Sequence, residues 1–190
     1  TVNFTPIINF SPVSNSLCLN DTFTFNNTSI GAFAFGWDMG DNSGEYFETT
    51  STPFKYIYPD TGIHQVKLTG YSLQGCRDSA YAVVYVRPLP KANFTVNDTV
   101  GCAPKNFSFN NTSILANGYK WLVGNTATTT STNRPDTLIS LSAQVVQVKL
   151  IATNQYNCKP DTAVKTLYTF SNPTPNFTMS KDSGCGPLPV

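Results

Sequence analysis

The sequence predicts an all-β protein made of small β-sandwich or β-barrel modules in tandem. Runs that alternate apolar and polar residues recur along the 190-residue chain, and clusters of turn-forming residues separate them. No stretch places apolar residues at helical spacing over the length of a helix. The order of the runs also repeats along the chain. Short strands at this spacing are typical of antiparallel sandwiches and barrels.

The expected strands follow the alternating runs in order. In FTFNNTS at 23–29, Phe23 and Phe25 share one face of a strand. Three later runs are rich in β-branched and aromatic residues: HQVKLTGY at 64–71, AYAVVYV at 80–86 and VVQVKLIAT at 145–153. Turn clusters in the first half are GDNSG at 40–44, PDTG at 59–62, LQGC at 73–76 and RPLP at 87–90. The segments recur about every 83 residues, and a unit of that length holds about seven such strands.

An internal repeat is the strongest feature of the chain. FNNTS occurs at 25–29 and again at 109–113, an offset of 84 (109 − 25) that Trp37 and Trp121 share. QVKL at 65–68 returns at 147–150, an offset of 82 (147 − 65). A third copy matches the second at an offset of 83, in which Pro173, Asn176, Phe177 and Cys185 repeat Pro90, Asn93, Phe94 and Cys102. Small insertions and deletions between matched blocks are typical of tandem copies of one module.

We therefore expect two whole modules flanked by partial ones. Residues 9–88 form the first module and residues 89–172 form a second, divergent copy. Residues 1–8 are expected to end a preceding module with its linker, and residues 173–190 to begin a truncated third, so the chain is interpreted as part of a longer array. A repeat of this length is enough for a small domain with its own core. The junctions RPLPKA and SNPTP are rich in proline, which makes short linkers semi-rigid.

Composition narrows the classes of function. Charged residues make up 12% of the chain and the net charge is +1, so no surface for nucleic acid is expected. No apolar run reaches the ~20 residues of a membrane span, so no membrane insertion is expected. The sequence has no HExxH, GxSxG, P-loop or dinucleotide motif, and its one histidine, His64, has no nucleophile motif beside it. We expect no catalytic activity and therefore name no catalytic residue.

The first module carries a family resemblance in WDMGDNS at 37–43, FKY at 54–56, YPDTGIHQVKLTGYS at 58–72 and GC at 75–76. This sequence resembles the PKD (polycystic kidney disease) domain, and the flanking CxxxxFxFNNTS and GCxD patterns resemble PKD-like repeats of secreted surface proteins of Bacteroidetes. The resemblance implies immunoglobulin-like sandwiches of seven antiparallel strands, strung in an elongated array and exported to the cell surface. The second module departs from the pattern, because LVGN follows Trp121 and places Leu122 and Asn125 where the first module has aspartates.

Asp38 and Asp41 form the one close acidic pair in an expected turn. Two carboxylates with nearby carbonyl groups can hold Ca²⁺, a hard cation that prefers oxygen ligands. The alternative is turn chemistry, in which the aspartates accept backbone hydrogen bonds and Gly40 supplies an unusual backbone dihedral. The second module lacks both acids and is still expected to fold, which favours the turn. No other cofactor is expected.

Five cysteines recur at matched positions of the repeats, too widely spaced for a zinc site or a CxxC redox pair. This favours disulfides and an oxidising compartment. If the strands run in simple up-and-down order, Cys18 and Cys158 face each other across the junction, and a Cys18–Cys158 bond would brace it. That pairing would leave Cys76, Cys102 and Cys185 for neighbouring modules. The alternative places one bond inside each module, Cys18–Cys76 and Cys102–Cys158.

These features predict a structural stalk or adhesin segment of a large exported protein, whose partners are neighbouring modules of the same chain. Trp37 and Trp121 each sit within an expected strand and are interpreted as core anchors. The rival hypothesis is an accessory module that binds a surface glycan or a protein beside a secreted enzyme. Such binding would use exposed aromatic residues, and the candidates are Tyr46, Phe47, Phe54, Tyr56 and Tyr58.

Overall fold

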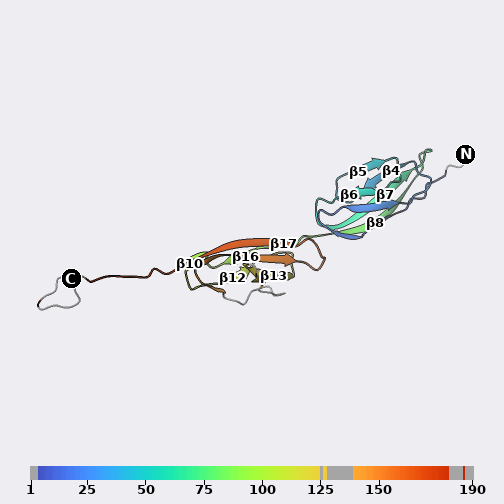
Figure 1. The fold of residues 1–190 in the computed structure, drawn as a ribbon. Helices are drawn as coiled ribbons and strands as arrows, with labels where there is room; N and C mark the ends of the chain where they lie inside the picture. The colour runs from blue at the N-terminus through green and yellow to red at the C-terminus, as the bar shows by residue number, and fades with distance from the viewer. Residues whose placement is uncertain (1–3, 125, 128–138, 180–185, 187–190) are drawn as a thin grey trace.

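The computed structural model describes residues 4–124, 126–127, 139–179 and 186. Over this part of the chain it contains strands and turns but no helix, so no described segment is a helix that could cross a membrane. The strands build two sandwiches that lie one after the other along an elongated molecule (Figure 1). The prediction of an all-β, immunoglobulin-like architecture is confirmed.

The first sandwich comprises the strands β1 (Phe10–Pro12), β2 (Ser16–Cys18), β3 (Phe23–Asn27), β4 (Ala34–Asp38), β5 (Glu45–Glu48), β6 (Phe54–Tyr56), β7 (Gly62–Tyr71) and β8 (Arg77–Arg87). One sheet has the order β1-β3-β6 and the other β2-β8-β7-β4-β5. The chain changes sheets between β1 and β2, because β1 pairs antiparallel with β3 while β2 pairs parallel with β8. The backbone N–H of Val13 still donates to the Thr24 oxygen at 2.8 Å, and the Asn15 oxygen already accepts from Tyr85 N–H at 2.8 Å, so the change occurs between Val13 and Asn15. The described strands of this sandwich therefore number eight rather than seven.

The second sandwich comprises β9 (Phe94–Val96), β10 (Val100–Cys102), β11 (Lys105–Phe107), β12 (Phe109–Asn111), β13 (Gly118–Val123), β14 (Thr126–Ala127), β15 (Ile139–Leu141), β16 (Gln144–Thr153) and β17 (Asp161–Phe170). Its large sheet has the order β10-β17-β16-β13-β14, and β12 pairs with β9 and β11 with β15. The register repeats that of the first sandwich, since Phe94 lies opposite Asn111 as Phe10 lies opposite Asn27. The strand that is continuous as β3 in the first sandwich is divided at Ser108 in the second.

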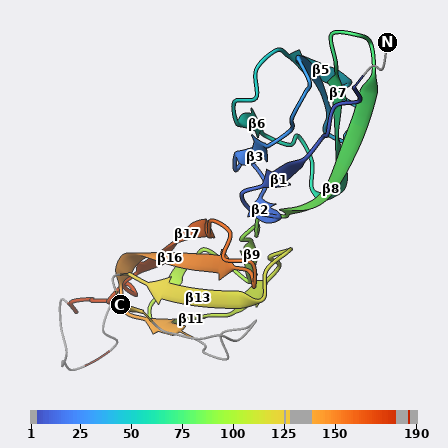
Figure 2. The ribbon, with the colours of Figure 1, turned by 90° about the vertical axis from the view of Figure 1, so that its right-hand side faces the viewer.

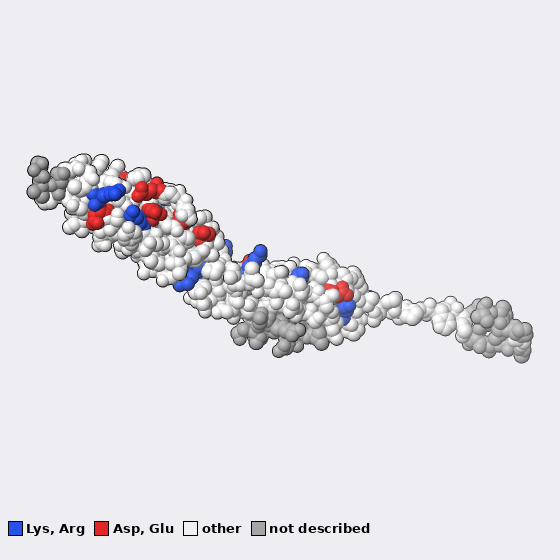
Figure 3. Space-filling model, turned by 180° about the vertical axis from the view of Figure 1, so that it is seen from behind, with Lys and Arg blue, Asp and Glu red and all other residues white. Residues whose placement is uncertain are grey.

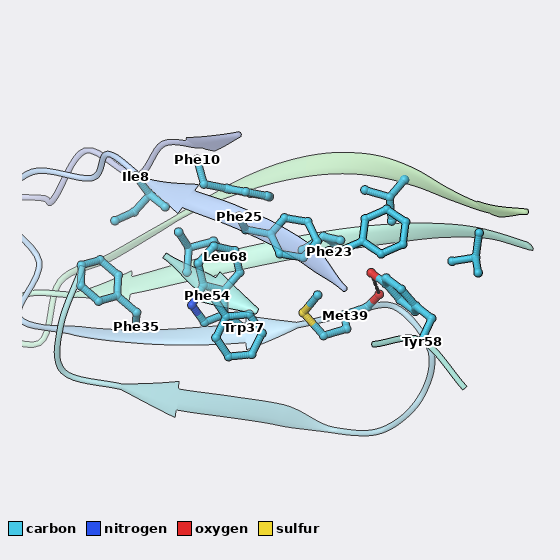
Figure 4. Packing of buried hydrophobic residues seen from close by; sticks show 13 residues of the cluster. Ile8, Phe10, Phe23, Phe25, Phe35, Trp37, Met39, Phe54, Tyr58 and Leu68 are labelled. Atoms are coloured by element: carbon cyan, nitrogen blue, oxygen red, sulfur yellow. Dashed lines mark hydrogen bonds between the residues drawn. The ribbon is translucent and has the colours of Figure 1, made fainter. Parts of the chain in front are cut away.

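Each sandwich has its own hydrophobic core around one tryptophan. Trp37 is fully buried, and its ring stacks on Phe54 and meets the edge of Phe10, with both centroid distances 5.1 Å (Figure 4). Trp121 is 1% exposed and lies 5.0 Å from the ring of Phe94. Buried residues of the two sandwiches form separate clusters, so the interior is not shared. Both tryptophans are therefore core anchors.

Neutral residues cover most of the surface. In the space-filling view of one face, small groups of basic and acidic side chains are scattered over a surface that is otherwise uncharged (Figure 3). The chain has only 12 Lys and Arg residues and 11 Asp and Glu residues, an excess of a single positive charge. The described part of the structure thus offers a ligand little long-range electrostatic attraction.

Candidate functional site

Three segments meet where the two sandwiches join. They are the end of β2, the linker that follows β8, and the loop between β16 and β17, here called the junction loop (residues 154–160). Figure 2 shows the linker crossing from the end of β8 to β9 with β2 beside it. The site is therefore made by residues far apart in the sequence, and its geometry depends on both sandwiches.

The junction loop is shaped by its own asparagines. The Asn154 side-chain Oδ1 accepts hydrogen bonds from the backbone N–H groups of Tyr156 (3.2 Å) and Cys158 (3.3 Å). Asn157 adopts a left-handed conformation with φ 55°, which asparagine tolerates better than most residues. These two features turn the chain tightly and present Cys158 to the first sandwich.

A disulfide joins the two sandwiches across this junction. Cys18 at the end of β2 is bonded to Cys158, with a Cα–Cα distance of 5.6 Å and a sequence separation of 140 residues. This is the cross-junction pairing considered in the sequence analysis. Among the described residues, Cys76 is a partly buried free thiol and Cys102 an exposed one. Cys185 lies outside the described residues.

Non-covalent contacts surround the disulfide. The Asn154 Nδ2 donates a hydrogen bond to the backbone oxygen of Pro88 at 2.8 Å. The guanidinium carbon of Arg87 lies 4.6 Å from the ring centroid of Tyr156 and 5.0 Å from that of Tyr85, both within the range of a cation–π contact. One Tyr belongs to each sandwich, so Arg87 links them. These contacts hold the junction loop against the linker.

The far end of the linker is held by the second sandwich. The Asp161 carboxylate accepts a hydrogen bond from the backbone N–H of Ala92 at 2.8 Å, just before β9 begins. The stretch from Arg87 to Ala92 is therefore fastened at both ends. Beside it lies a shallow hollow of about 340 Å³, lined by Pro88, Leu115, Ala116, Asn117, Asn154, Gln155 and Tyr156.

Sequence reasoning found the cysteines of this site but missed Asn154, Tyr156 and Arg87. One signal for the loop was present, because SLQGC at 72–76 and NQYNC at 154–158 share a polar first residue and a Gly or Asn before the cysteine. Nothing in the sequence pairs Arg87 with Tyr156, since that contact depends on how two separate sandwiches are oriented.

The aspartates considered for calcium serve the turn after β4. The Asp38 carboxylate accepts a hydrogen bond from the backbone N–H of Gly40 at 2.9 Å. The Asp41 carboxylate accepts hydrogen bonds from the backbone N–H of Ser43 at 3.0 Å and from the hydroxyl of Tyr56 at 2.7 Å. Burial raises the pKa of the Asp41 carboxyl, but hydrogen bonds from Ser43 and Tyr56 outweigh that effect, and the pKa lies below its ordinary value of 3.8. No group of three or more His, Cys, Asp or Glu side chains in the described chain is arranged to hold a metal. A calcium ion here would compete with these hydrogen bonds.

The aromatic candidates for ligand binding divide into buried and exposed groups. Tyr58 is 1% exposed, donates its hydroxyl to the Met39 backbone oxygen at 3.0 Å and stacks on His64. Phe54 is also buried, and Tyr56 is partly buried. Tyr46 and Phe47 are 38% and 67% exposed, so only these two present much of their surface to solvent.

The comparison with protein families identifies the first sandwich. Residues 7–83 match the model of the PKD domain. The first sandwich is a PKD domain. This match spans β1 to the middle of β8 and includes the Trp37 core and the Asp38–Asp41 turn. The PKD resemblance of the first module is thereby confirmed. The match does not extend to the second sandwich, which shares the repeated segments FNNTS and QVKL with the first.

No curated protein matches the chain. Solved structures with similar folds include titin domains I67–I69, at 14% identity and TM-score 0.48 over 86% of this chain and 65% of that one. A structure of carbohydrate-binding modules of the β-sandwich superfamily is 18% identical, with TM-score 0.45 over 80% of this chain and 56% of that one. The fibronectin(III)-like modules of Clostridium thermocellum CbhA are 11% identical, with TM-score 0.39 over 90% and 100%. At such identities a shared fold implies no shared function.

Proposed function

We propose that this chain is a non-catalytic segment of an exported cell-surface protein, where it acts as a spacer and load-bearing rod. The observation that carries the proposal is the Cys18–Cys158 bond between two sandwiches with separate cores. A flexible string of domains needs no covalent link across its linker. A bond in that position is useful where the relative placement of the domains must survive mechanical load. Disulfides also fit an oxidising, extracytoplasmic setting.

The bond changes the covalent path along which a pulling force travels. Force applied at the N-terminal side reaches Cys18 through β1 and β2, crosses the disulfide to Cys158, and leaves along β17. The 140-residue separation between the two cysteines therefore encloses a loop that lies outside this path. Unfolding of that loop adds no length to the molecule while the bond is intact.

The strands that remain in the path are held by neighbours. β17 lies between β10 and β16 in the large sheet of the second sandwich, and its pairing with β16 extends from Asp161 to Thr169. In the first sandwich, β2 pairs in parallel with the end of β8. Pulling along a paired strand loads several hydrogen bonds at once, so these strands resist extraction as a group.

Single-molecule pulling on the full chain tests this function. With handles at the two ends, the oxidised chain should lengthen only by the residues outside the disulfide loop. Reduction, or the variant Cys158→Ser, should add about 460–500 Å, the length of a 140-residue extended segment at about 3.3–3.6 Å per residue. Cys76→Ser, which removes a free thiol, is the matched control and should behave like the unchanged chain. An oxidised chain that gains the full reduced length would contradict the proposal.

A second candidate function is suggested by an exposed apolar face on the PKD domain. Tyr81 and Val83 of β8 and Ile63 of β7 are 60%, 40% and 70% exposed, and Phe47 of β5 lies on the same large sheet. Exposed aromatic rings are what a glycan- or protein-binding accessory module would use. Binding to a glycan array that is lost on Tyr81→Ala or Phe47→Ala, with the fold intact, would favour this candidate. Loss on Tyr46→Ala alone would instead place the ligand near β5 and β6.

A further inference from the structure

Cys76 and Cys102, the free cysteines among the described residues, occupy repeat positions equivalent to those that form the junction bond. Cys102 is the counterpart of Cys18 in the repeat, with an offset of 84 (102 − 18), and Cys76 is the counterpart of Cys158, with an offset of 82 (158 − 76). The described residues thus contain one junction bond, Cys18–Cys158, and an unbonded counterpart of each of its cysteines.

The backbone around Cys102 reproduces the backbone around Cys18. Cys102 lies opposite Phe170 in the parallel pairing of β10 with β17, as Cys18 lies opposite Arg87 in the pairing of β2 with β8. The residue after each cysteine donates its backbone N–H to that opposite residue, at 2.7 Å for Ala103 and 2.9 Å for Leu19. The free end of the second sandwich therefore presents its cysteine in the backbone setting that the first sandwich uses for its bond.

The loop around Cys76 reproduces the junction loop. Ser72 Oγ accepts the backbone N–H of Cys76 at 3.1 Å, as Asn154 Oδ1 accepts that of Cys158 at 3.3 Å. Gly75, the residue before the cysteine, has φ 83°, the left-handed conformation that Asn157 adopts in the other loop. Leu73, Gln74 and Gly75 of this loop are exposed, Leu73 by 76%, so its tip is open to solvent.

We propose that the Cys102 end of the second sandwich is a covalent docking site for the Cys76-type loop of another module of this kind, and that Cys76 offers the complementary half. The partner is thus a module that carries Ser or Asn, two residues, Gly or Asn, and then Cys in its loop between the last two strands. The proposal rests on the proposed load-bearing function, because it extends the junction bond from one joint to successive joints.

The bond requires an oxidant, and a low-molecular-weight disulfide of the glutathione class supplies it. The Cys102 thiolate attacks that disulfide and releases one small thiol, leaving a mixed disulfide on Cys102. The loop cysteine of the partner then attacks the Cys102 sulfur and releases the second small thiol. Two protein thiols are oxidised to one bond and one small disulfide is reduced to two thiols.

Side chains around Cys102 and Cys76 differ from those around the Cys18–Cys158 bond. Phe170 stands where Arg87 stands, and Gln74 stands where Tyr156 stands, so the cation–π contact has no counterpart. The shared features are the cysteines, the backbone pairing and the loop conformation. Cys102 therefore selects its partner cysteine because a short linker aligns the two thiols and raises their effective concentration.

A chain with one added module tests the proposal. Residues 93–172 are repeated after residue 175, so that a second copy of the second sandwich follows SNPTP in the register of the first junction. After oxidation in a glutathione buffer and alkylation of free thiols, peptide mapping should show Cys18 bonded to the first Cys158 and Cys102 bonded to the added copy's Cys158. The variant Cys102→Ser should lose only the second bond, and serine in place of the added copy's Cys158 should leave Cys102 alkylated.

Two results would overturn the docking site. One is a folded chain in which Cys18–Cys158 is intact while Cys102 is fully alkylated. The other is a chain in which Cys102 pairs with any cysteine other than that of the added loop. Either result leaves the pulling behaviour of the 190-residue chain unchanged, so it is distinguishable from a failure of the load-bearing function. If the oxidised chain instead gains its full reduced length on pulling, the function fails whatever bond Cys102 makes.

Discussion

At the scale of single residues, Trp37, Trp121 and Asp41 each act through the groups that surround their side chains. Trp37 and Trp121 share a repeat offset and a place within a strand, and burial in a core follows from their size and apolar surface. For Asp41, the choice between an ion site and a turn depends on which groups surround its carboxylate. The sequence shows that Ser43 is near, but Tyr56 reaches Asp41 from another strand, β6, and only the fold reveals that contact.

The Asp41 contacts predict how the first sandwich responds to acid. Because its folded-state pKa lies below 3.8, the carboxylate stabilises the fold above that value, and the stabilisation is lost as the pH falls through the folded-state pKa. Tyr56→Phe removes one of the hydrogen bonds that lower the pKa. The difference in free energy of unfolding between the unchanged protein and Tyr56→Phe should therefore be larger at pH 6 than at pH 3.

Urea unfolding followed at a series of pH values measures that difference. Asp98, whose pKa is lowered by a hydrogen bond from Lys105, lies in the second sandwich and is the same in both proteins, so its contribution cancels. Tyr81→Phe, a change at an exposed tyrosine, serves as control and should show no such pH dependence. A Tyr56→Phe difference that stays constant from pH 6 to pH 3 would rule out the Asp41 contact as its source.

At the scale of elements, strands with an alternating pattern were predictable, including the five-residue β3 in FTFNNTS, whereas short strands such as β1, β2 and β10 were not. The alternating runs at 64–71, 80–86 and 145–153 fall within β7, β8 and β16. The separation of β1 from β2 depends on which sheet each segment can reach, and β10 is likewise separated from β9. A three-residue strand has too few residues to show a periodicity, so its partner comes from the fold rather than from its own pattern.

The junction loop leads to a prediction about stiffness. Tyr156→Ala removes one of the two rings beside Arg87, a contact worth about 0.5–1 kcal/mol at an exposed site. With the disulfide intact, this change should alter the relative orientation of the sandwiches little, because the bond still constrains the loop. Combined with Cys158→Ser, it should loosen the junction more than Cys158→Ser alone.

Residual dipolar couplings of the two sandwiches measure this loosening. A stiff junction gives both sandwiches a common alignment tensor, and a loose one gives tensors of different magnitude. Tyr168→Ala, which removes a 41% exposed tyrosine on β17, provides the matched control. The Arg87 contact has no role in stiffness if the Tyr156→Ala, Cys158→Ser double variant keeps its tensors as similar as those of Cys158→Ser.

At the scale of the whole molecule, the internal repeat predicted two separate cores. The spacing of the repeat fits two cysteine pairings, and an assumed up-and-down order of strands favoured the bond across the junction, because it puts Cys18 and the junction loop at facing ends of the two sandwiches. The structure has this bond, with the Cα atoms of Cys18 and Cys158 5.6 Å apart. The placement of Cys18 at the junction follows from the parallel pairing of β2 with β8, a long-range feature that no local pattern encodes.

Separate cores predict separate unfolding. Leu68 and Leu150 are fully buried counterparts, each paired across the sheet with the tryptophan of its own sandwich. Leu68→Ala should destabilise only the PKD domain and Leu150→Ala only the second sandwich, each by about 2–5 kcal/mol, because the cavity left in one core has no contact with the other. Calorimetry of the Cys158→Ser protein, in which the sandwiches are not tied together, should show one transition moved to lower temperature and the other unmoved in each variant.

In the oxidised protein the same shifts should be coupled, since the disulfide restricts the unfolded state of either sandwich while the other is folded. A variant that moves both transitions equally in Cys158→Ser would show that the two cores are one cooperative unit.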